Sequence, residues 1–148
     1  MISPDKYGRE ISRPDKSQTM KRINLAYWII TTLFSAFMIF SSIGGLTLNE
    51  EAVDYLHVKM GYPLYFIQFI SVAKIIGAIA ILLPMLPVRV KEWAYFGLFI
   101  DLVAAVISFW AIGDPVSIWA PMFLFIAVLL VAYWLHHKRL SLRTSTPV

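Results

Sequence analysis

The sequence predicts an all-α protein, an integral membrane four-helix bundle with a short interfacial amphipathic helix between spans 1 and 2. Of its 148 residues, 59% are hydrophobic and only 15% are charged, whereas soluble domains average about 25% charged residues. A chain of this length buries too small a share of its surface to hide so much apolar area from water. Lipid is therefore the expected solvent for most of the chain.

Four long apolar runs define the predicted organisation, because each is near the ~20 residues that cross a bilayer core as a helix. The first run holds 24 residues without a charge and is too long for a signal peptide, so it is predicted to stay in the membrane. The prediction is a flexible cytoplasmic N-terminal tail at 1–22, a four-helix transmembrane domain at 23–137 with spans at about 23–46, 64–86, 93–112 and 115–135, and a cytoplasmic C-terminal tail at 138–148.

The connections between the spans carry their own signals. Thr47 and Glu50 have the spacing of a capping box, and apolar residues recur after them at helical spacing, at Val53, Leu56 and Met60. This pattern predicts the amphipathic helix, which would lie on the outer membrane surface. The last span is predicted to begin at Pro115, with Asp114 as its N-cap.

Lysine and arginine fall almost entirely on one side of the predicted spans. Six lie in the N-terminal tail, two in the turn at 88–92 and three in the C-terminal tail, whereas the two loops on the other face contain only Lys59. Because positively charged loops stay in the cytoplasm, both termini are predicted to be cytoplasmic.

Two formally charged residues, Lys74 and Asp101, lie within the predicted spans. Lys74 is ten residues into span 2, and Asp101 is eight residues into span 3 from the opposite face. At about 1.5 Å per residue, both reach roughly the middle of a ~30 Å hydrocarbon core. An unpaired charge at that depth costs about 2.5–3.5 kcal/mol. We therefore expect the two side chains to pair between neighbouring antiparallel helices.

Further polar and small residues share these helices. The predicted intramembrane polar core, a possible site, comprises Lys74, Asp101, Gln68, Ser71 and Ser108. The predicted helix-packing residues, small enough to let backbones approach closely, are Gly77, Ala78, Gly97, Ala104 and Ala105. Two interpretations stay open: the pair only fixes the register of two helices, or it belongs to a polar cavity for a proton, a quinone or a small substrate.

Several kinds of site are excluded or not expected. The chain has no cysteine, which excludes disulfides and thiolate metal sites. No catalytic residue and no metal site is predicted, because no Ser/His/Asp arrangement, phosphate loop or metal-spaced cluster is present. Membrane topology explains the basic residues, so no nucleic acid is expected as a partner.

The stretch from His57 to Asp114 resembles the DoxX-like family of small four-helix membrane proteins, and with its flanking helices the resemblance spans roughly residues 20–137. The residues that carry it are Gly61-Tyr62-Pro63, Lys74-Ile75-Ile76-Gly77-Ala78, Pro84, Pro87, Val90-Lys91-Glu92-Trp93-Ala94-Tyr95, Gly97, Asp101, Ala104-Ala105, Ser108 and Gly113-Asp114. The resemblance implies a multi-pass protein of the bacterial cytoplasmic (inner) membrane. It also implies an association with thiosulfate–quinone oxidoreductases or membrane-bound redox complexes.

Three functions are compatible with the sequence pattern and the resemblance. The first is a non-catalytic subunit or scaffold of a membrane complex, with a redox partner or a second copy of the chain beside it in the bilayer. The second is a small-molecule or proton transporter that uses the Lys74–Asp101 pair, and the third is an enzyme with Asp101 as a proton acceptor. We favour them in that order. No cofactor is predicted, and a quinone is the one that the resemblance would bring.

Overall fold

The structure, a computed structural model, describes residues 15–145 and is helical along most of this range. Its elements are α1 (Lys16–Thr47), α2 (Glu50–Ala52), the π-helix η1 (Val53–Lys59), α3 (Leu64–Leu82), α4 (Val88–Ala111) and α5 (Val116–Thr144). Helices α1, α3, α4 and α5 are long and apolar enough to cross a membrane. The predicted fold class is confirmed, including the short helical segment between the first two spans.

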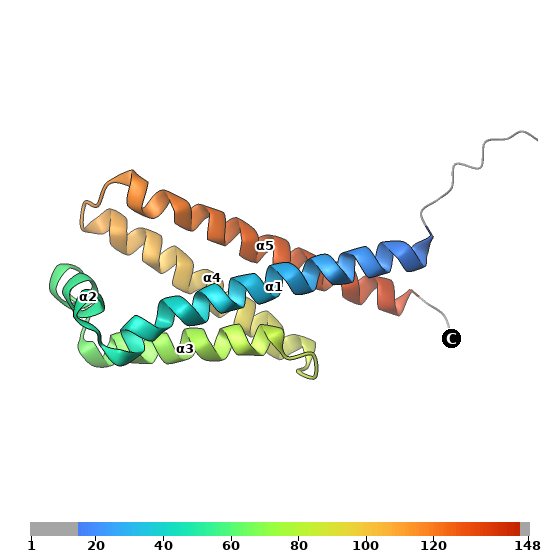
Figure 1. The fold of residues 1–148 in the computed structure, drawn as a ribbon, viewed down its shortest axis with the longest axis horizontal. Coiled ribbons are helices and arrows are strands. Elements are labelled where there is room, and N and C mark those ends of the chain that lie inside the picture. The colour runs from blue at the N-terminus through green and yellow to red at the C-terminus, as the bar shows by residue number, and fades with distance from the viewer. Residues whose placement is uncertain (1–14, 146–148) are drawn as a thin grey trace, which may run out of the picture.

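The long helices form an up-and-down bundle in which α1 and α4 each pack against both α3 and α5. Consecutive helices run in opposite directions, so the start of α1 and the end of α5 lie together (Figure 1). We call this the terminal end, which also carries the α3–α4 connection at 83–87. The opposite, cap end carries α2, η1 and the α4–α5 connection at 112–115.

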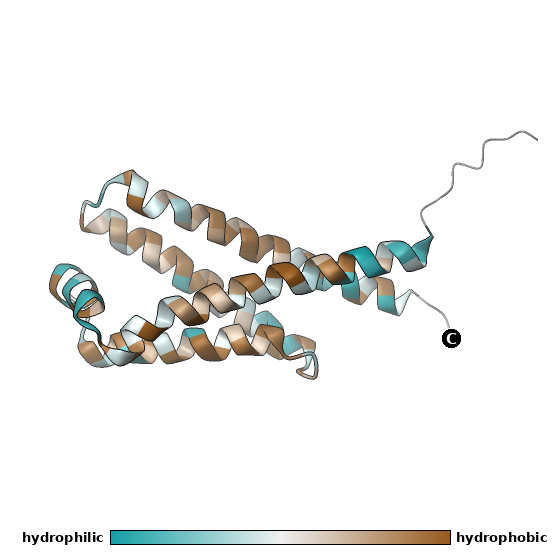
Figure 2. Ribbon diagram, in the orientation of Figure 1, coloured by the Kyte–Doolittle hydropathy of each residue, from teal (hydrophilic) through white to brown (hydrophobic). Residues whose placement is uncertain are grey.

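Most of the bundle surface is apolar. Hydrophobic residues predominate along the middle of the long helices, whereas hydrophilic residues gather at the start of α1 and over α2 (Figure 2). Large side chains such as Leu33, Phe40 and Trp110 point outward, with 67%, 77% and 69% of their surface exposed. A soluble monomer does not expose apolar area on this scale, so these side chains face lipid in a multi-pass membrane protein.

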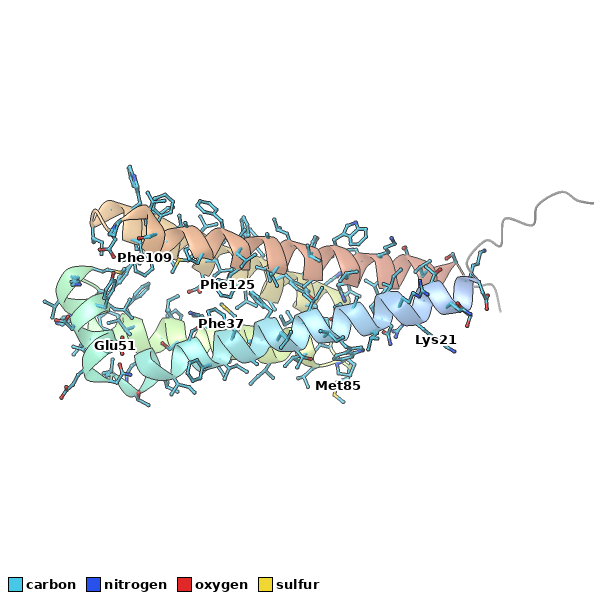
Figure 3. The ribbon with its side chains drawn as sticks, turned by 45° about the horizontal axis from the view of Figure 1, so that its top comes forward. Lys21, Phe37, Glu51, Met85, Phe109 and Phe125 are labelled. Carbon is cyan, nitrogen blue, oxygen red and sulfur yellow. The ribbon has the colours of Figure 1, made fainter. Side chains whose placement is uncertain are left out.

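The buried core lies between the middle of the bundle and its terminal end. Its members come from all of the long helices and are Phe34, Met38, Ala78, Ile81, Tyr95, Leu98, Leu102, Leu129 and Ala132. On α1, Thr31, Ser35 and Ser42 are fully buried along the same face. Beside this core, Phe37 and Phe125 point toward each other and stack with ring centroids 4.0 Å apart, closing the contact between α1 and α5 (Figure 3).

The helices extend beyond the boundaries that hydropathy predicted. The N-terminal tail was predicted to reach residue 22, but α1 begins at Lys16, where the Asp15 carboxylate accepts a hydrogen bond from the Ser17 amide. The rest of that predicted tail, 1–14, lies outside the described residues. The C-terminal tail predicted from 138 is helical as far as Thr144. Likewise the predicted turn at 88–92 is the first part of α4. Hydropathy marks where a helix leaves lipid, whereas a formed helix propagates into polar sequence at little cost.

The capping predictions were also wrong in detail. Thr47 is the last residue of α1, and its hydroxyl donates to the Ile43 carbonyl. The following helix is capped instead by Asn49, whose side chain accepts from the Ala52 amide at 2.8 Å. Leu48 makes the turn between them with a left-handed backbone, φ 50°.

At the start of α5, Pro115 occupies the cap position without a side-chain hydrogen bond, so Asp114 does not act as the N-cap. The Asp114 carboxylate accepts instead from the Tyr55 hydroxyl of η1. A tertiary contact has therefore replaced the local cap that the spacing predicted.

Gly45 lies where α1 packs tightly against Ile67 and Ser71 of α3. A methyl group added at Gly45 would overlap the Ser71 hydroxyl and lie 3.3 Å from Ile67 Cγ2, whereas one added at Gly97 would meet no atom within 4 Å. We expect Gly45→Ala to lower the free energy of unfolding by about 1–3 kcal/mol, the usual cost of overpacking. Thermal unfolding in detergent measures it. Gly97→Ala is the matched control, and an equal loss in both variants would contradict the close α1–α3 contact.

Candidate functional site

A cavity of about 900 Å³ occupies the half of the bundle next to the cap end. Helices α1, α3 and α4 form its walls, and α2 and η1 lie over it. Its apolar wall is rich in aromatic and aliphatic side chains, among them Phe40, Tyr55, Leu56, Tyr62, Phe66, Ile70, Ile100 and Phe109. Small residues of the facing helices leave the space that the cavity fills, namely Gly44, Gly45, Gly97, Ala104 and Ala105.

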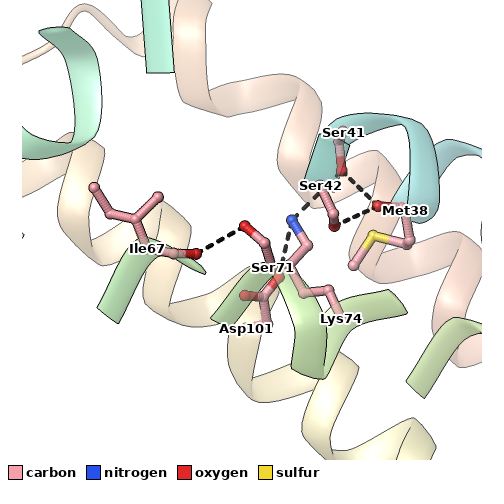
Figure 4. A network of polar contacts seen from close by, with 7 residues as sticks. All are labelled: Met38, Ser41, Ser42, Ile67, Ser71, Lys74 and Asp101. Atoms are coloured by element: carbon pink, nitrogen blue, oxygen red, sulfur yellow. Dashed lines mark hydrogen bonds and ion pairs between the residues drawn. The ribbon is translucent and has the colours of Figure 1, made fainter. Parts of the chain in front are cut away.

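Lys74 of α3 and Asp101 of α4 meet in the wall of this cavity. Lys74 Nζ lies 3.5 Å from Asp101 Oδ2, and both side chains keep a small exposed fraction, 19% and 16%. Figure 4 shows the ammonium group between the Asp101 carboxylate and the Ser41 hydroxyl of α1. Three helices therefore contribute to one polar group at mid-depth.

The hydroxyl groups of α1 give this cluster a defined direction of hydrogen bonding. Ser41 and Ser42 both donate to the Met38 carbonyl, at 3.0 and 2.7 Å. Because each hydroxyl has a single hydrogen, the Ser41 oxygen is left as an acceptor for Lys74 Nζ, 3.4 Å away. The ammonium group thus uses Asp101 and Ser41 and keeps donor capacity toward the cavity.

The pairing of the two charges lowers the cost of holding them inside the bilayer. A lone charge at this depth costs about 2.5–3.5 kcal/mol, and attraction between opposite charges offsets part of that. The remaining exposure of both side chains means that the cavity also supplies room for water. The pair is therefore a partly solvated ion pair rather than a dry one.

We call the segment at 49–62, which contains α2 and η1, the cap. Two of its tyrosines bind the end of α4 and the α4–α5 connection. The Tyr55 hydroxyl donates to Asp114 and its ring lies 5.6 Å from the ring of Phe109. The Tyr62 hydroxyl lies 2.6 Å from the Ser108 hydroxyl, which itself donates to the Ala104 carbonyl at 2.7 Å. The hydrogen bond to Asp114 raises the pKa of Tyr55 above its ordinary value. Tyr55 therefore stays protonated, and the contact holds, at any neutral or moderately alkaline pH.

The predicted polar residues are divided between the cavity and the outer surface. Ser71 lines the cavity and donates to the Ile67 carbonyl at 2.8 Å, and Ser108 lies at its rim. Gln68 is on another face of α3, where its amide donates to the Leu46 carbonyl of α1 at 3.3 Å. Gln68 therefore lies outside the group that the ion pair organises.

The predicted small residues serve two purposes. Gly77 lets the Leu98 side chain approach, so that a Cβ there would lie 3.3 Å from Leu98 Cγ, and Ala78 is fully buried in the core. The small residues of α4, Gly97, Ala104 and Ala105, line the cavity instead. On α4, small residues thus make open space rather than a tight helix contact.

Sequence reasoning missed the α1 and cap residues of the site. Ser41 was not predicted because nothing in the sequence fixes the rotation of α1 relative to α3. Tyr55 and Tyr62 lie in a segment assigned to the membrane surface, and their bonding partners are 59 and 46 residues away. The segment has only these two aromatic residues in sixteen positions, so no signal in the sequence singled them out.

The arrangement suits the binding of a small molecule better than covalent chemistry. Across residues 15–145, no three metal-ligating side chains lie close enough together to hold an ion. The cavity offers an apolar wall, the paired side chains of Lys74 and Asp101, and the polar side chains of Asn49 and Glu51. A few placed polar groups in a largely apolar pocket are typical of ligand sites.

Comparison with known proteins identifies one family. The model of the DoxX-like family matches residues 29–132, a range that includes the ion pair and all of the cavity walls. No curated protein and no solved structure matches the chain.

Exchanging the two charges tests their contact directly. We expect Lys74→Asp and Asp101→Lys each to reduce the amount of folded protein in the membrane, because leaving an unpaired buried charge costs about 3–5 kcal/mol. The double variant restores the attraction and should recover most of the yield, measured by fluorescence-detected size-exclusion chromatography. A double variant that accumulates no better than the singles would contradict the pairing.

The tyrosine contact with Asp114 tests how the cap is held. We expect Tyr55→Phe to increase amide hydrogen exchange across residues 49–62, because the cap loses its hydrogen bond to Asp114 in the α4–α5 connection while keeping the ring contact with Phe109. Tyr65→Phe is the matched control, since Tyr65 has 73% of its surface exposed. In the unaltered protein, the contact should persist below the ordinary tyrosine pKa and be lost as the pH rises through the raised value. Unchanged exchange in Tyr55→Phe would show that the cap is held by other contacts.

Proposed function

This chain belongs to the DoxX-like family, and from that premise we propose that it is a non-catalytic subunit of a quinone-linked membrane redox complex. Its role is to hold a quinone in the cavity between α1, α3 and α4. The observation that carries the proposal is the Lys74–Asp101 pair in the wall of an otherwise largely apolar cavity.

The size and walls of the cavity fit a quinone ring with part of its tail. Sites for molecules of this size range over about 300–1,000 Å³, and this cavity has about 900 Å³. Aromatic side chains such as Phe66 and Phe109 line it and can stack on a flat ring. Exposed apolar residues at its edge suit a tail that continues into lipid.

The polar groups fit the head of such a molecule. A quinone carries carbonyl oxygens, which accept hydrogen bonds, and Lys74 Nζ is a donor with capacity to spare. Asp101 orients the ammonium group, and Ser41 supports it from α1. When bound, the quinone would supply electron-accepting chemistry, while these residues would bind and orient it.

Lys74 and Asp101 neutralise each other's charge, which is why we propose a non-catalytic role. Lys74 and Asp101 lie 3.5 Å apart, and the attraction between their opposite charges favours keeping the two side chains together. Neither group is thereby poised as a free base or nucleophile. Electron transfer itself would belong to a partner protein in the membrane.

We propose that both termini are cytoplasmic and that the protein lies in the bacterial inner membrane. The eleven Lys and Arg residues of the tails and the 88–92 segment are all on the terminal side of the chain, against Lys59 on the cap side. The positive-inside tendency then places the terminal end in the cytoplasm. The cavity would then lie in the half of the bilayer away from the cytoplasm, beneath α2 and η1.

A small-molecule or proton transporter is the second candidate. The observation that favours it is the mid-depth position of the ion pair in the wall of the cavity, since transporter sites lie near the bilayer midplane. Asp101→Asn separates the two candidates. A transporter loses transport and stays folded, whereas a subunit loses stability, or the partner that co-purifies with it in mild detergent.

Adding a quinone, and then blocking the cavity with a large side chain, tests the proposed ligand. We expect decylubiquinone to raise the unfolding temperature of the protein in nanodiscs, because a ligand that binds only the folded state stabilises it. Gly97→Phe should remove that increase, since the new ring points into open space that the ligand needs. Ile107→Phe is the matched control, because Ile107 is 56% exposed on the same helix. No stabilisation by the quinone, or an equal loss in both variants, would reject the quinone site.

A further inference from the structure

A second, smaller pocket of about 240 Å³ lies at the terminal end of the bundle, far along the helices from the cavity above. It is formed where α1, the start of α4 and the end of α5 meet beside the α3–α4 connection. Its polar lining is almost entirely cationic or hydrogen-bond donating: Asn24, Lys91, His136, Arg139 and Arg143.

The central observation is the burial of Lys91 in the wall of this pocket. Only 5% of its surface is exposed. Within residues 15–145, the ion pairs join Lys74 to Asp101 and His137 to Glu92, and none of them includes Lys91. Burying a lysine side chain without a counter-ion is costly, so an anion bound in this pocket would stabilise the folded protein.

The neighbouring groups add to the positive charge instead of neutralising it. Arg139 and Arg143 of α5 line the same pocket. Arg139 is held in place by the ring of Tyr27, 4.2 Å below its guanidinium carbon, and the ring of Trp28 is 5.6 Å away. Among the described residues, no carboxylate pairs with this arginine, and its remaining N–H groups are available to a ligand.

The start of α4 adds to the positive potential of the pocket. Val88, its first residue, lines the pocket, and Pro87 before it offers no side-chain cap. The first amide groups of a 24-residue helix carry the positive end of its dipole. Anions bind at such helix starts when side chains support them.

The pocket lies at the level expected of a membrane surface. Met85, in the adjoining connection, is 84% exposed (Figure 3), and Trp93 is 81% exposed one turn into α4. Exposed tryptophans are typical of the interface between lipid tails and head groups. The pocket is thus placed where lipid phosphates are and not in bulk water.

We propose that this pocket binds the phosphate of an anionic phospholipid head group, with Lys91, Arg139 and Arg143 as its ligands. Trp28 and the apolar residues of the α3–α4 connection face the glycerol and the first part of the acyl chains. Basic pockets between transmembrane helices bind acidic head groups in this way. The proposal does not depend on what occupies the larger cavity.

Paired variants on the first turn of α4 test it. We expect the unfolding temperature to be higher in phosphatidylcholine nanodiscs that contain phosphatidylglycerol than in phosphatidylcholine alone. Lys91→Met should lose more than half of that increase. Arg89→Gln removes the same charge from an exposed position outside the pocket and should keep it. Equal losses would show a general surface-charge effect and overturn the proposal.

Two further measurements distinguish a lipid head group from free phosphate and provide a test that does not depend on Lys91→Met folding. Inorganic phosphate added to phosphatidylcholine nanodiscs should give no comparable stabilisation, and an equal effect would show that the pocket takes free anions and not lipid. If Lys91→Met fails to fold, native mass spectrometry of Arg143→Gln decides, because Arg143 is exposed. This variant should retain fewer phosphatidylglycerol molecules than Arg89→Gln, and equal retention would overturn the proposal.

Discussion

The attraction between Lys74 and Asp101 across 3.5 Å constrains how α3 and α4 face one another. A charge near the bilayer centre cannot turn to lipid without a penalty of about 2.5–3.5 kcal/mol, so each helix is held in one rotation. That rotation directs Ser71 on α3 and Gly97, Ala104 and Ala105 on α4 toward the same space. The cavity is a consequence of the pairing, because the helix faces that carry the charges also carry the smallest side chains.

Side-chain size then decides which half of the bundle is closed. Toward the terminal end, Met38, Tyr95 and Leu98 fill the interior between the helices. Toward the cap end, the equivalent positions hold glycine, alanine and serine, and the aromatic residues of the cap cover the space without filling it. Because protein interiors pack to high density, the cavity of about 900 Å³ distinguishes this half of the bundle from the closed half.

Hydropathy predicted the four long helices, and the positions of the two buried charges predicted their contact. Both predictions succeed because a polar interruption of a spanning helix and an unpaired charge are each costly in lipid. The ends of the helices were not predictable in this way. Residues 16–22 and 138–144 are polar in sequence yet helical, since water tolerates helix and coil almost equally. The roles of Ser41 and Tyr55 depend on how α1 and the cap are rotated, which no local pattern encodes. Gln68 shows the converse, because a polar residue satisfied by the Leu46 carbonyl need not belong to a site.

The buried core separates the two polar regions of the molecule, and this bears on function. Between the ion pair and the terminal pocket lie Phe34, Ile81, Leu98 and Leu129, all nearly inaccessible, and the Phe37–Phe125 stack closes the α1–α5 contact beside them. A solute as large as a quinone that reached Lys74 from the cap end would meet this packed layer, in which the hydroxyl groups of Thr31, Ser35 and Tyr95 are also buried. Transport would require that layer to part, with loss of its packing, whereas binding requires no change at all. This packing supports the proposal that the protein holds a ligand and does not pass it across the membrane.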